Sequence, residues 1–115
     1  MATGGYRLGV DFGTSNTVAV LSWPDGHVRP LLCDGAPLLP SAVYAQSADE
    51  LLVGRDAVQA ARAVPENYEP HPKRRVDDGT VLLGRAEIAV ADLFAAVFGR
   101  VVAEVDRVAQ TRPVT

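Results

Sequence analysis

The chain has 115 residues, of which 48% are hydrophobic and 22% are charged, and its formal net charge is −3 at pH 7. This length suits one domain with a hydrophobic core. The acidic balance excludes electrostatic attraction to nucleic acid or to an anionic membrane, so neither is expected as a partner. With one cysteine, Cys33, no signal-peptide pattern and no membrane-length apolar run, the sequence indicates a cytoplasmic protein.

The first 40 residues predict an antiparallel meander of three strands. The expected strands are Tyr6–Asp11, Thr17–Ser22 and His27–Cys33, and the turn sequence "WPDG" joins the last two as a hairpin. The following stretch, Asp34–Pro40, contains two prolines and a glycine and is expected to be a connection.

The middle of the chain predicts a short hairpin and a helix. "SAVYA" and "LLVG" have strand patterns on either side of the polar tip "QSADE", and Arg55–Ala63 is expected to be helical until Pro65 stops it. The next stretch, "PENYEPHPKRRVDDG", has three prolines and many charges. It is therefore expected to be irregular and exposed.

A long amphipathic helix is predicted from Val90 to Gln110, after a small hairpin that contains "TVLLG". One stripe of the helix is apolar and consists of Phe94, Val97, Phe98, Val101, Val105 and Val108. The charged residues Arg100, Glu104, Asp106 and Arg107 lie mostly off this stripe. Because so broad a stripe needs covering, we expect the chain to be part of a larger fold.

The stretch "LGVDFGTSNTVAVL", residues 8–21, places a carboxylate and a small polar turn between two apolar strands. In a tight turn, successive backbone N–H groups can point into one concavity and bind an anion. Gly13 permits close approach, and Thr14, Ser15 and Asn16 add short hydrogen-bonding side chains. Asp11 would repel a bare phosphate but suits a hydrated Mg²⁺ that accompanies it. The alternative is an ordinary hairpin in which Asp and Asn are turn formers.

Lys73 is the second candidate, because the other ten of the eleven basic residues are arginines. A lysine is a compact point charge that can lie beside a transferring phosphoryl group or orient a water. A solvated charge in an exposed loop is the alternative. Cys33 has no basic neighbour in the sequence and is expected to be a small core residue rather than a nucleophile.

Four segments together resemble the actin/hexokinase/Hsp70 ATPase superfamily, and Hsp70 most of all. "LGVDFGTSNTVAVL" resembles its first phosphate motif, and "LLPSAVYA" resembles the segment in which a Pro-Ser pair opens a strand. "LLVGRDAVQAARAVPEN" is similar to a strand, helix and Asn-Pro-x-Asn passage of the family. "YEPHPKRR" places Lys73 where the family has a catalytic lysine followed by arginine.

The resemblance implies the fold class α/β and a ribonuclease H-like, actin-type ATPase lobe. Residues 6–36 would be the first strands and phosphate turn of the lobe. Residues 37–112 would be the small outer α+β subdomain, which ends in the long helix. The domain would be incomplete, since nothing in the sequence resembles the second phosphate loop, the adenosine-binding glycines or the peptide-binding domain.

The resemblance also implies an ATP-binding and ATP-hydrolysing chaperone. Gly13, Thr14, Ser15 and Asn16 would hold the β- and γ-phosphates of ATP, and Asp11 would lie near Mg²⁺ through water. Lys73 would position the attacking water and stabilise charge on the γ-phosphate. Unfolded client polypeptides and co-chaperones would be the partners of the full-length protein. The 115 residues alone are expected to be inactive.

The sequence departs from the family around Lys73, where Pro70, His71 and Pro72 replace residues that are usually apolar, and at Phe12, where many members have a smaller aliphatic residue. Two other functions therefore stay open. One is a sugar or acid kinase of the same superfamily, which would share the Asp11 turn but has no need of Lys73. The other is an Hsp70-like interaction module without catalytic activity.

Overall fold

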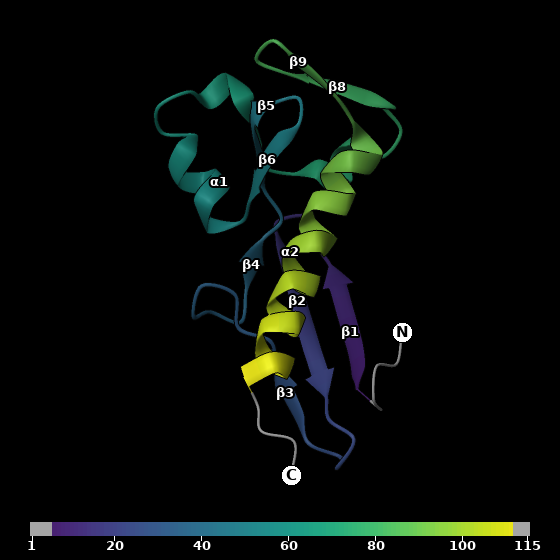
Figure 1. Ribbon diagram of the computed structural model, residues 1–115. Coiled ribbons are helices and arrows are strands. Elements are labelled where there is room, and N and C mark those ends of the chain that lie inside the picture. Colours follow the sequence, from purple (N-terminus) through teal and green to yellow (C-terminus); the bar gives the residue numbers. More distant parts are fainter. Residues whose placement is uncertain (1–5, 112–115) are drawn as a thin grey trace.

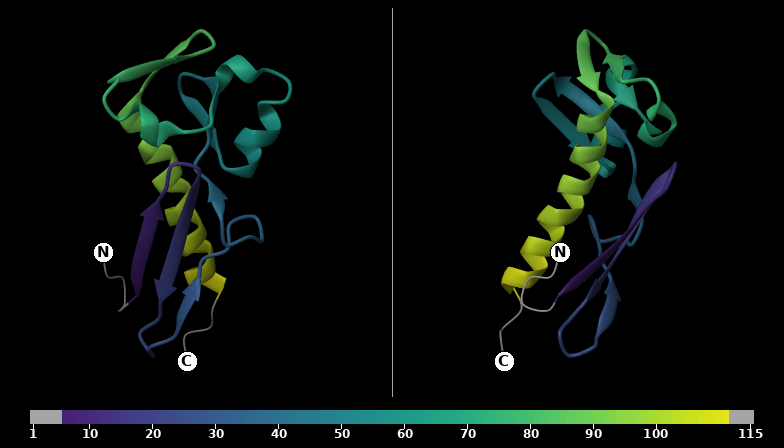
Figure 2. Two further views of the ribbon diagram at one scale, coloured as in Figure 1. Left: turned by 180° about the vertical axis from the view of Figure 1, so that it is seen from behind. Right: turned by 90° about the vertical axis from the view of Figure 1, so that its right-hand side faces the viewer.

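The computed structural model describes residues 6–111 and shows mixed α and β structure arranged along one long helix (Figure 1). The molecule is elongated, with principal-axis extents of 49 × 28 × 22 Å. A layer of antiparallel strands lies beside the carboxyl-terminal half of the helix, and smaller elements surround its amino-terminal half (Figure 2).

Strand β2 (Asn16–Ser22) is the centre of the first sheet and pairs antiparallel with three others. These are β1 (Arg7–Phe12), β3 (Val28–Pro30) and β4 (Leu39–Pro40). β1 and β2 pair over their whole length because each carries alternating apolar residues that face the helix. The predicted antiparallel meander is confirmed.

The third strand is shorter than the predicted His27–Cys33, since only Val28–Pro30 pair with β2. The chain then turns sharply at Asp34 and Gly35, whose φ angles are 54° and 77°. Two successive positive φ angles are typical of a type I′ turn, which Asp-Gly sequences favour. This turn ends the strand and leads to β4, a strand that the sequence pattern did not predict.

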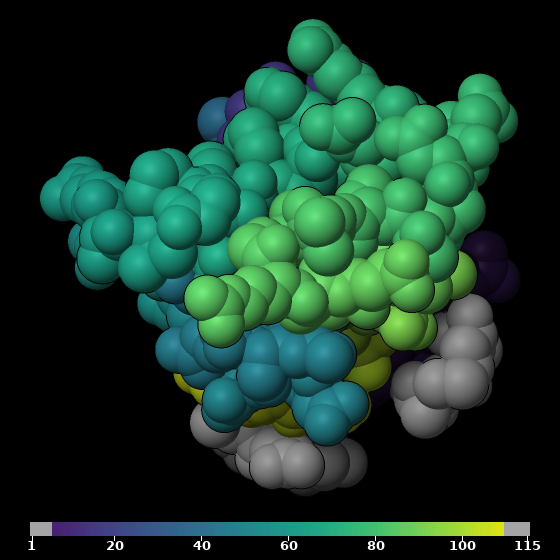
Figure 3. Space-filling view, turned by 90° about the horizontal axis from the view of Figure 1, so that it is seen from above, coloured from purple at the N-terminus to yellow at the C-terminus, as the bar shows by residue number. Residues whose placement is uncertain are grey.

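The outer part of the molecule contains two small sheets and short helical segments. β5 (Val43–Ser47) pairs with β6 (Glu50–Val53) and with β7 (Tyr68–Glu69), and β8 (Thr80–Leu83) pairs with β9 (Ala86–Ala89). Helix α1 (Arg55–Ala60) follows β6 and is shorter than predicted, because its last residues form turns up to Ala63. Seen from above, these outer elements make up most of the visible surface (Figure 3).

The proline-rich stretch after α1 is more ordered than the sequence pattern predicted. It contains the 3₁₀ turns η1 (Pro65–Asn67) and η2 (Pro72–Arg75), with β7 between them. Glu69 and Pro72 are buried, so the prediction of a wholly irregular and exposed segment was wrong. The prolines start the two turns, where their fixed φ is compatible with helical geometry, rather than excluding structure.

Helix α2 (Val90–Thr111) matches the predicted long helix, and its apolar stripe is the core face except at Phe98, which is 38% exposed. Leu93, Val97 and Val101 are at most 1% exposed. One hydrophobic cluster joins this face to both parts of the chain and includes Ala19, Leu31, Cys33, Leu39, Val43, Ala45, Leu83 and Ile88. The helix therefore connects the first sheet to the outer elements through a single core.

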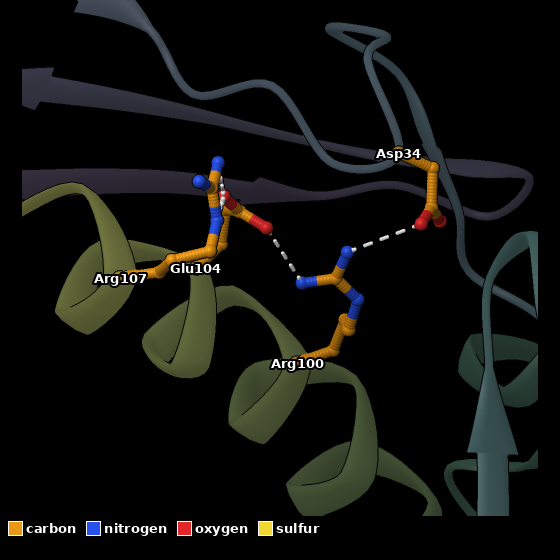
Figure 4. Close-up of polar contacts among 4 residues, drawn as sticks. All are labelled: Asp34, Arg100, Glu104 and Arg107. Atoms are coloured by element: carbon orange, nitrogen blue, oxygen red, sulfur yellow. Dashed lines mark hydrogen bonds and ion pairs between the residues drawn. The ribbon is translucent and has the colours of Figure 1, made fainter. Parts of the chain in front are cut away.

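The position of Glu104 on α2 differs from the prediction. Its charge suggested a solvent-facing residue, but it is only 5% exposed. Arg100 Nη1 donates to its Oε1 at 3.1 Å and Arg107 Nε to its Oε2 at 2.6 Å (Figure 4). Arginines one helical turn before and after the carboxylate satisfy both oxygens, which makes burial of the charge tolerable.

The fold class is thus α/β, with antiparallel sheets and a carboxyl-terminal helix. The end of the expected second part, at residue 112, lies outside the described residues. Within residues 6–111, no helix combines the length and the apolar character needed to cross a membrane.

Candidate functional site

The turn between β1 and β2 is a tight structure that requires glycine. The amide of Gly13 donates to the carbonyl oxygen of Asn16 at 2.9 Å, which closes the turn. A Cβ on Gly13 would lie 2.5 Å from that same oxygen, well inside van der Waals contact. The sequence argument that Gly13 permits close approach therefore applies to a backbone-to-backbone contact within the turn.

The residues inside the turn leave hydrogen-bonding groups accessible. Thr14 is half-buried, and Ser15 and Asn16 are exposed. Among residues 6–111, no protein acceptor receives a hydrogen bond from the backbone amides of Thr14 or Ser15. Adjacent amides without protein partners at a turn are suited to binding an anion.

Ser41 follows β4, which pairs with β2 on the side away from β1, and it holds the turn from that side. Its hydroxyl donates to the carbonyl oxygen of Gly13 at 2.9 Å. Its backbone amide donates to the carbonyl oxygen of Ser15, also at 2.9 Å. Because one hydroxyl has one proton, the 2.9 Å contact with Thr17 Oγ1 must be donated by Thr17. Ser41 is 0% exposed and Thr17 is 1% exposed, so these bonds form in a region without solvent competition.

His71 joins the turn to the loop that carries Lys73. Its Nδ1 lies 3.2 Å from the carbonyl oxygen of Thr14, which is 57 positions earlier in the chain. A carbonyl oxygen can only accept, so Nδ1 carries the proton in this contact. Lys73 follows two positions later, in η2. The structure therefore brings together two segments that the sequence analysis had selected separately.

The carboxylate of Glu69 fixes the shape of this loop. Glu69 is 5% exposed, and its Oε2 accepts the amide of His71 at 2.8 Å while its Oε1 accepts Arg75 Nε at 2.7 Å. The hydrogen bond to Glu69 raises the pKa of Arg75 above its ordinary value, so Arg75 stays cationic. The two bonds clamp the loop on both sides of Lys73.

Lys73 itself is exposed. In the part of the chain that the structure describes, its ammonium group forms no ion pair and no hydrogen bond. Both the lysine and the amides of the turn are thus available to an external group. An anion is the ligand that both would favour.

Asp11 lies near the end of β1 and is exposed. No group of three or more His, Cys, Asp or Glu side chains that could hold a metal ion occurs among the described residues. Residues 6–111 therefore provide no all-protein cage for a cation in this region. A single exposed carboxylate fits a magnesium ion that keeps most of its water and is held mainly by phosphate oxygens.

A second polar cluster lies on α2, next to Cys33, and its character is structural. Arg100 Nη2 is 3.5 Å from Asp34 Oδ1, which ties the helix to the type I′ turn (Figure 4). Cys33 is 5% exposed, and burial raises the pKa of its thiol despite the nearby Arg100. A buried thiol with a raised pKa is a poor nucleophile, in agreement with its prediction as a core residue.

Sequence reasoning missed the residues that assemble the site. Ser41 was noted only as part of a Pro-Ser pair, His71 only as a departure from a family pattern, and Glu69 not at all. One local signal was available for Glu69. It lies between two prolines of a loop that was expected to be exposed, and Arg75 follows six positions later. The hydrogen bonds to Gly13 and Thr14 have no local signal, since they span 28 and 57 positions.

A scan against models of known protein families finds no match for this chain. A search of curated protein sequences likewise finds no match.

Proposed function

We propose that this chain carries one side of an ATP phosphate site of the Hsp70 type, with an actin-type, ribonuclease H-like lobe as its fold. The turn Gly13–Asn16 would hold the β- and γ-phosphates. Lys73 would stabilise charge on the γ-phosphate and position the attacking water. The observation that carries the proposal is the hydrogen bond from His71 to Thr14 O, which docks the lysine loop on the turn.

Three further features support phosphate as the ligand. The amides of Thr14 and Ser15 have no protein acceptor among the described residues, and the turn that presents them is closed by the Gly13–Asn16 hydrogen bond. Ser41 holds two of the turn's carbonyl oxygens, which keeps the amides in place before a ligand arrives. Pre-organised donors of this kind stabilise charge without a reorganisation cost during the reaction.

The residues present also fit a nucleotide that arrives with Mg²⁺. When bound, the ion would neutralise phosphate charge, and Asp11 would contact it through water. The carboxylate is exposed at the strand end, where it can accept hydrogen bonds from coordinated water. In phosphoryl transfer, this positioning and electrostatic stabilisation account for most of the catalysis.

At the level of the whole protein, we expect an ATP-hydrolysing, cytoplasmic chaperone that binds unfolded polypeptides and co-chaperones. The described residues supply the phosphate turn and the lysine loop. Contacts to adenosine and a second phosphate loop would have to come from elsewhere. The 115-residue chain is therefore expected to bind Mg·ATP only weakly and to hydrolyse none.

The test is a titration of the ¹⁵N-labelled chain with Mg·ATP, followed by nuclear magnetic resonance. The amide resonances of Gly13–Asn16 should shift progressively and report a Kd weaker than about 100 μM, that is, less than about 5.5 kcal/mol of binding free energy. Mg·pyrophosphate should shift the same resonances, because the proposal assigns recognition to phosphate. AMP, which lacks the β- and γ-phosphates, should not shift them.

The proposal fails if Mg·ATP leaves these four resonances unmoved in a chain whose dispersed spectrum shows that it is folded. It also fails if the shifts occur on another surface. Micromolar binding or measurable ATP hydrolysis by the 115-residue chain would contradict the expectation of an incomplete site. In a longer protein that contains this segment, peptide-stimulated turnover would favour the chaperone, and sugar-stimulated turnover would favour the kinase.

A further inference from the structure

Three successive carbonyl oxygens of the turn between β1 and β2 each accept a hydrogen bond. The hydroxyl of Ser41 donates to Gly13 O at 2.9 Å, and the backbone amide of Ser41 donates to Ser15 O, also at 2.9 Å. The carbonyl oxygen between these two, on Thr14, accepts a hydrogen bond from Nδ1 of His71 at 3.2 Å. The hydroxyl and the amide of Ser41 keep the same charge at all ordinary pH values, whereas an imidazole does not. The middle carbonyl therefore has a donor that can change its charge.

Each of these carbonyls shares a peptide group with the amide of the next residue. Thr14 O and the amide of Ser15 belong to one trans peptide, in which C=O and N–H point in opposite directions. A donor on Thr14 O therefore lies behind the amide of Ser15 and polarises it without blocking it. Hydrogen bonds linked in such a chain strengthen one another. The amide of Ser15 has no protein acceptor within residues 6–111, so its donor strength is available to an external anion.

The hydrogen bond of His71 leaves one ring nitrogen able to take up a proton. Because a carbonyl oxygen only accepts, Nδ1 carries the proton of the neutral ring and Nε2 carries the lone pair. Nε2 forms no hydrogen bond within the described part of the chain, and the residue is half-buried. A second proton can therefore bind at Nε2 without breaking the bond from Nδ1 to Thr14 O.

We propose that His71 is a positioning residue of the phosphate site and that its charge sets how strongly the turn binds an anion. The inference rests on the proposed function and adds regulation by pH to that site. The positive charge would act on the anion through the Thr14–Ser15 peptide, since a charge-assisted hydrogen bond is stronger than a neutral one. It would also attract the anion directly. Anion binding therefore tightens as the pH falls through about 6.5, where histidine ordinarily becomes charged.

Other charged groups lie on the loop of His71 and on the elements next to it. They are Glu69, Lys73, Arg74, Arg75, Asp77 and Asp78 in the loop, Asp11 on β1, and Asp92 in the first turn of α2, which packs on η2. Glu69 is in direct contact, because its Oε2 accepts the backbone amide of His71 at 2.8 Å. A test must therefore compare chains that retain all of these groups and differ only in the imidazole.

The experiment is a titration of the ¹⁵N-labelled chain with sulfate at pH values from about 5 to about 8, the range in which histidine changes charge. Sulfate has the tetrahedral shape of phosphate but stays fully ionised over this range, so the charge of the ligand is constant. Sodium chloride keeps the ionic strength constant. The amide shifts of Ser15 should report a Kd that is about three- to tenfold lower at the acidic end than at the alkaline end, the effect of one nearby charge.

His71→Asn is the matched variant, because its side-chain N–H can still donate to Thr14 O but cannot become charged. Its Kd for sulfate should change by less than about twofold over the same pH range. If His71 only held the loop in place, this variant would keep the pH dependence of the parent. His27→Asn removes the other histidine of the chain, which is exposed and pairs with Asp25, and it should keep that dependence in full.

A second measurement needs no variant. If the charged form of His71 binds sulfate more tightly, sulfate must favour the charged form by the same factor. Saturating sulfate should therefore raise the pH at which His71 is half protonated by about 0.5–1, which corresponds to the three- to tenfold change in Kd. The ring resonances of His71 and His27 report both titrations in one sample. His27 follows the other end of β2 and should titrate as it does without sulfate.

Three results would overturn the inference. The first is sulfate binding at the turn with the same pH dependence in the parent and in His71→Asn. The second is a titration of His71 that saturating sulfate leaves unchanged. In both cases the proposed phosphate site would remain, without this regulation. The third is a turn that binds no sulfate at any pH, and the Mg·pyrophosphate titration then decides separately whether the phosphate site exists. Loss of the pH dependence in His71→Asn, together with a sulfate-induced shift at His71 and none at His27, would support the inference.

Discussion

His71 Nδ1 lies 3.2 Å from the carbonyl oxygen of Thr14 and donates a hydrogen bond to it. This contact joins the loop of the lone lysine to the turn between β1 and β2. The turn and the loop are each also held by a second residue: Ser41 bonds to the turn, and Glu69 bonds to the loop. The relative position of the turn and the lysine loop therefore depends on few, identifiable hydrogen bonds.

His71→Ala should loosen the lysine loop without unfolding the chain. The expected loss of unfolding free energy is about 0.5–1.5 kcal/mol, the usual net value of one hydrogen bond. Urea denaturation measures this loss, and amide shifts should appear at Thr14 and Ser15. His71→Asn, which keeps a side-chain N–H at a similar position, should recover part of the stability. His27→Ala is the matched control, because the exposed His27–Asp25 pair should contribute less than about 0.5 kcal/mol. Equal losses for the two alanine variants would contradict the linking role of His71.

Ser41→Ala should cost more than a typical surface hydrogen bond. It leaves the carbonyl oxygen of Gly13 and the buried hydroxyl of Thr17 without their partner. The expected loss is about 1–3 kcal/mol, since unsatisfied buried groups carry a desolvation penalty. Ser47→Ala, at an exposed position, should change the midpoint of urea unfolding very little. A Ser41→Ala protein as stable as the parent would show that the turn does not depend on Ser41.

Gly13→Ala should distort the turn, because the new Cβ would meet a backbone oxygen 2.5 Å away. The neighbour is main chain within a hydrogen-bonded ladder, so it cannot move aside cheaply, and we expect about 1–3 kcal/mol of destabilisation. Gly99→Ala in α2 provides the contrast. Apart from its chain neighbours and the backbone of its own helix, no atom lies within 4 Å of the added Cβ, and better helix propensity should stabilise the protein by up to about 1 kcal/mol. Thermal unfolding of the two variants should therefore shift in opposite directions.

Glu104 should make the stability of the chain depend on pH in the acidic range. Burial by itself raises the pKa of this carboxyl, but hydrogen bonds from Arg107 and Arg100 outweigh burial and lower it below the ordinary glutamate value. A depressed pKa in the folded state contributes stability above the unfolded-state pKa, and this contribution is lost as the pH falls through the folded-state pKa.

The matching variant is Glu104→Gln, measured by urea unfolding at neutral pH and in steps below about pH 5. At neutral pH it should be less stable by about 1–3 kcal/mol, because charge-assisted hydrogen bonds are lost. The difference from the parent should shrink as the pH falls. Glu50→Gln, at an exposed position, should show no such convergence. If the difference in unfolding free energy between Glu104→Gln and the parent stayed constant across this pH range, Glu104 would not be the source of the pH dependence.

Lys73→Ala separates binding from stability. The exposed lysine makes no ion pair within the described residues, so the unfolding free energy should change by less than about 0.5 kcal/mol. The affinity for Mg·pyrophosphate at the turn should fall about three- to tenfold, the effect of one partly solvated charge. Arg74→Ala, the neighbouring cation in η2, should have a smaller effect. Equal effects of the two variants would favour a general charge effect over a specific role of Lys73.

The sequence by itself predicted the elements whose causes are local. Apolar runs on either side of a polar turn indicated β1 and β2, Gly13 indicated a tight turn, and the helical stripe indicated α2 almost to its observed bounds. These features follow from backbone sterics and from side-chain periodicity, which a short window of sequence contains.

Only the tertiary structure decided which polar groups meet. His71 and Ser41 contact the turn across 57 and 28 positions, and charge pattern alone placed Glu104 on the wrong side of α2. A polar side chain becomes buried when a partner satisfies it, and the partner is supplied by whichever segment packs nearby. Residue type therefore indicated a phosphate turn and a lysine, whereas packing determined that Thr14 and the lysine loop lie together.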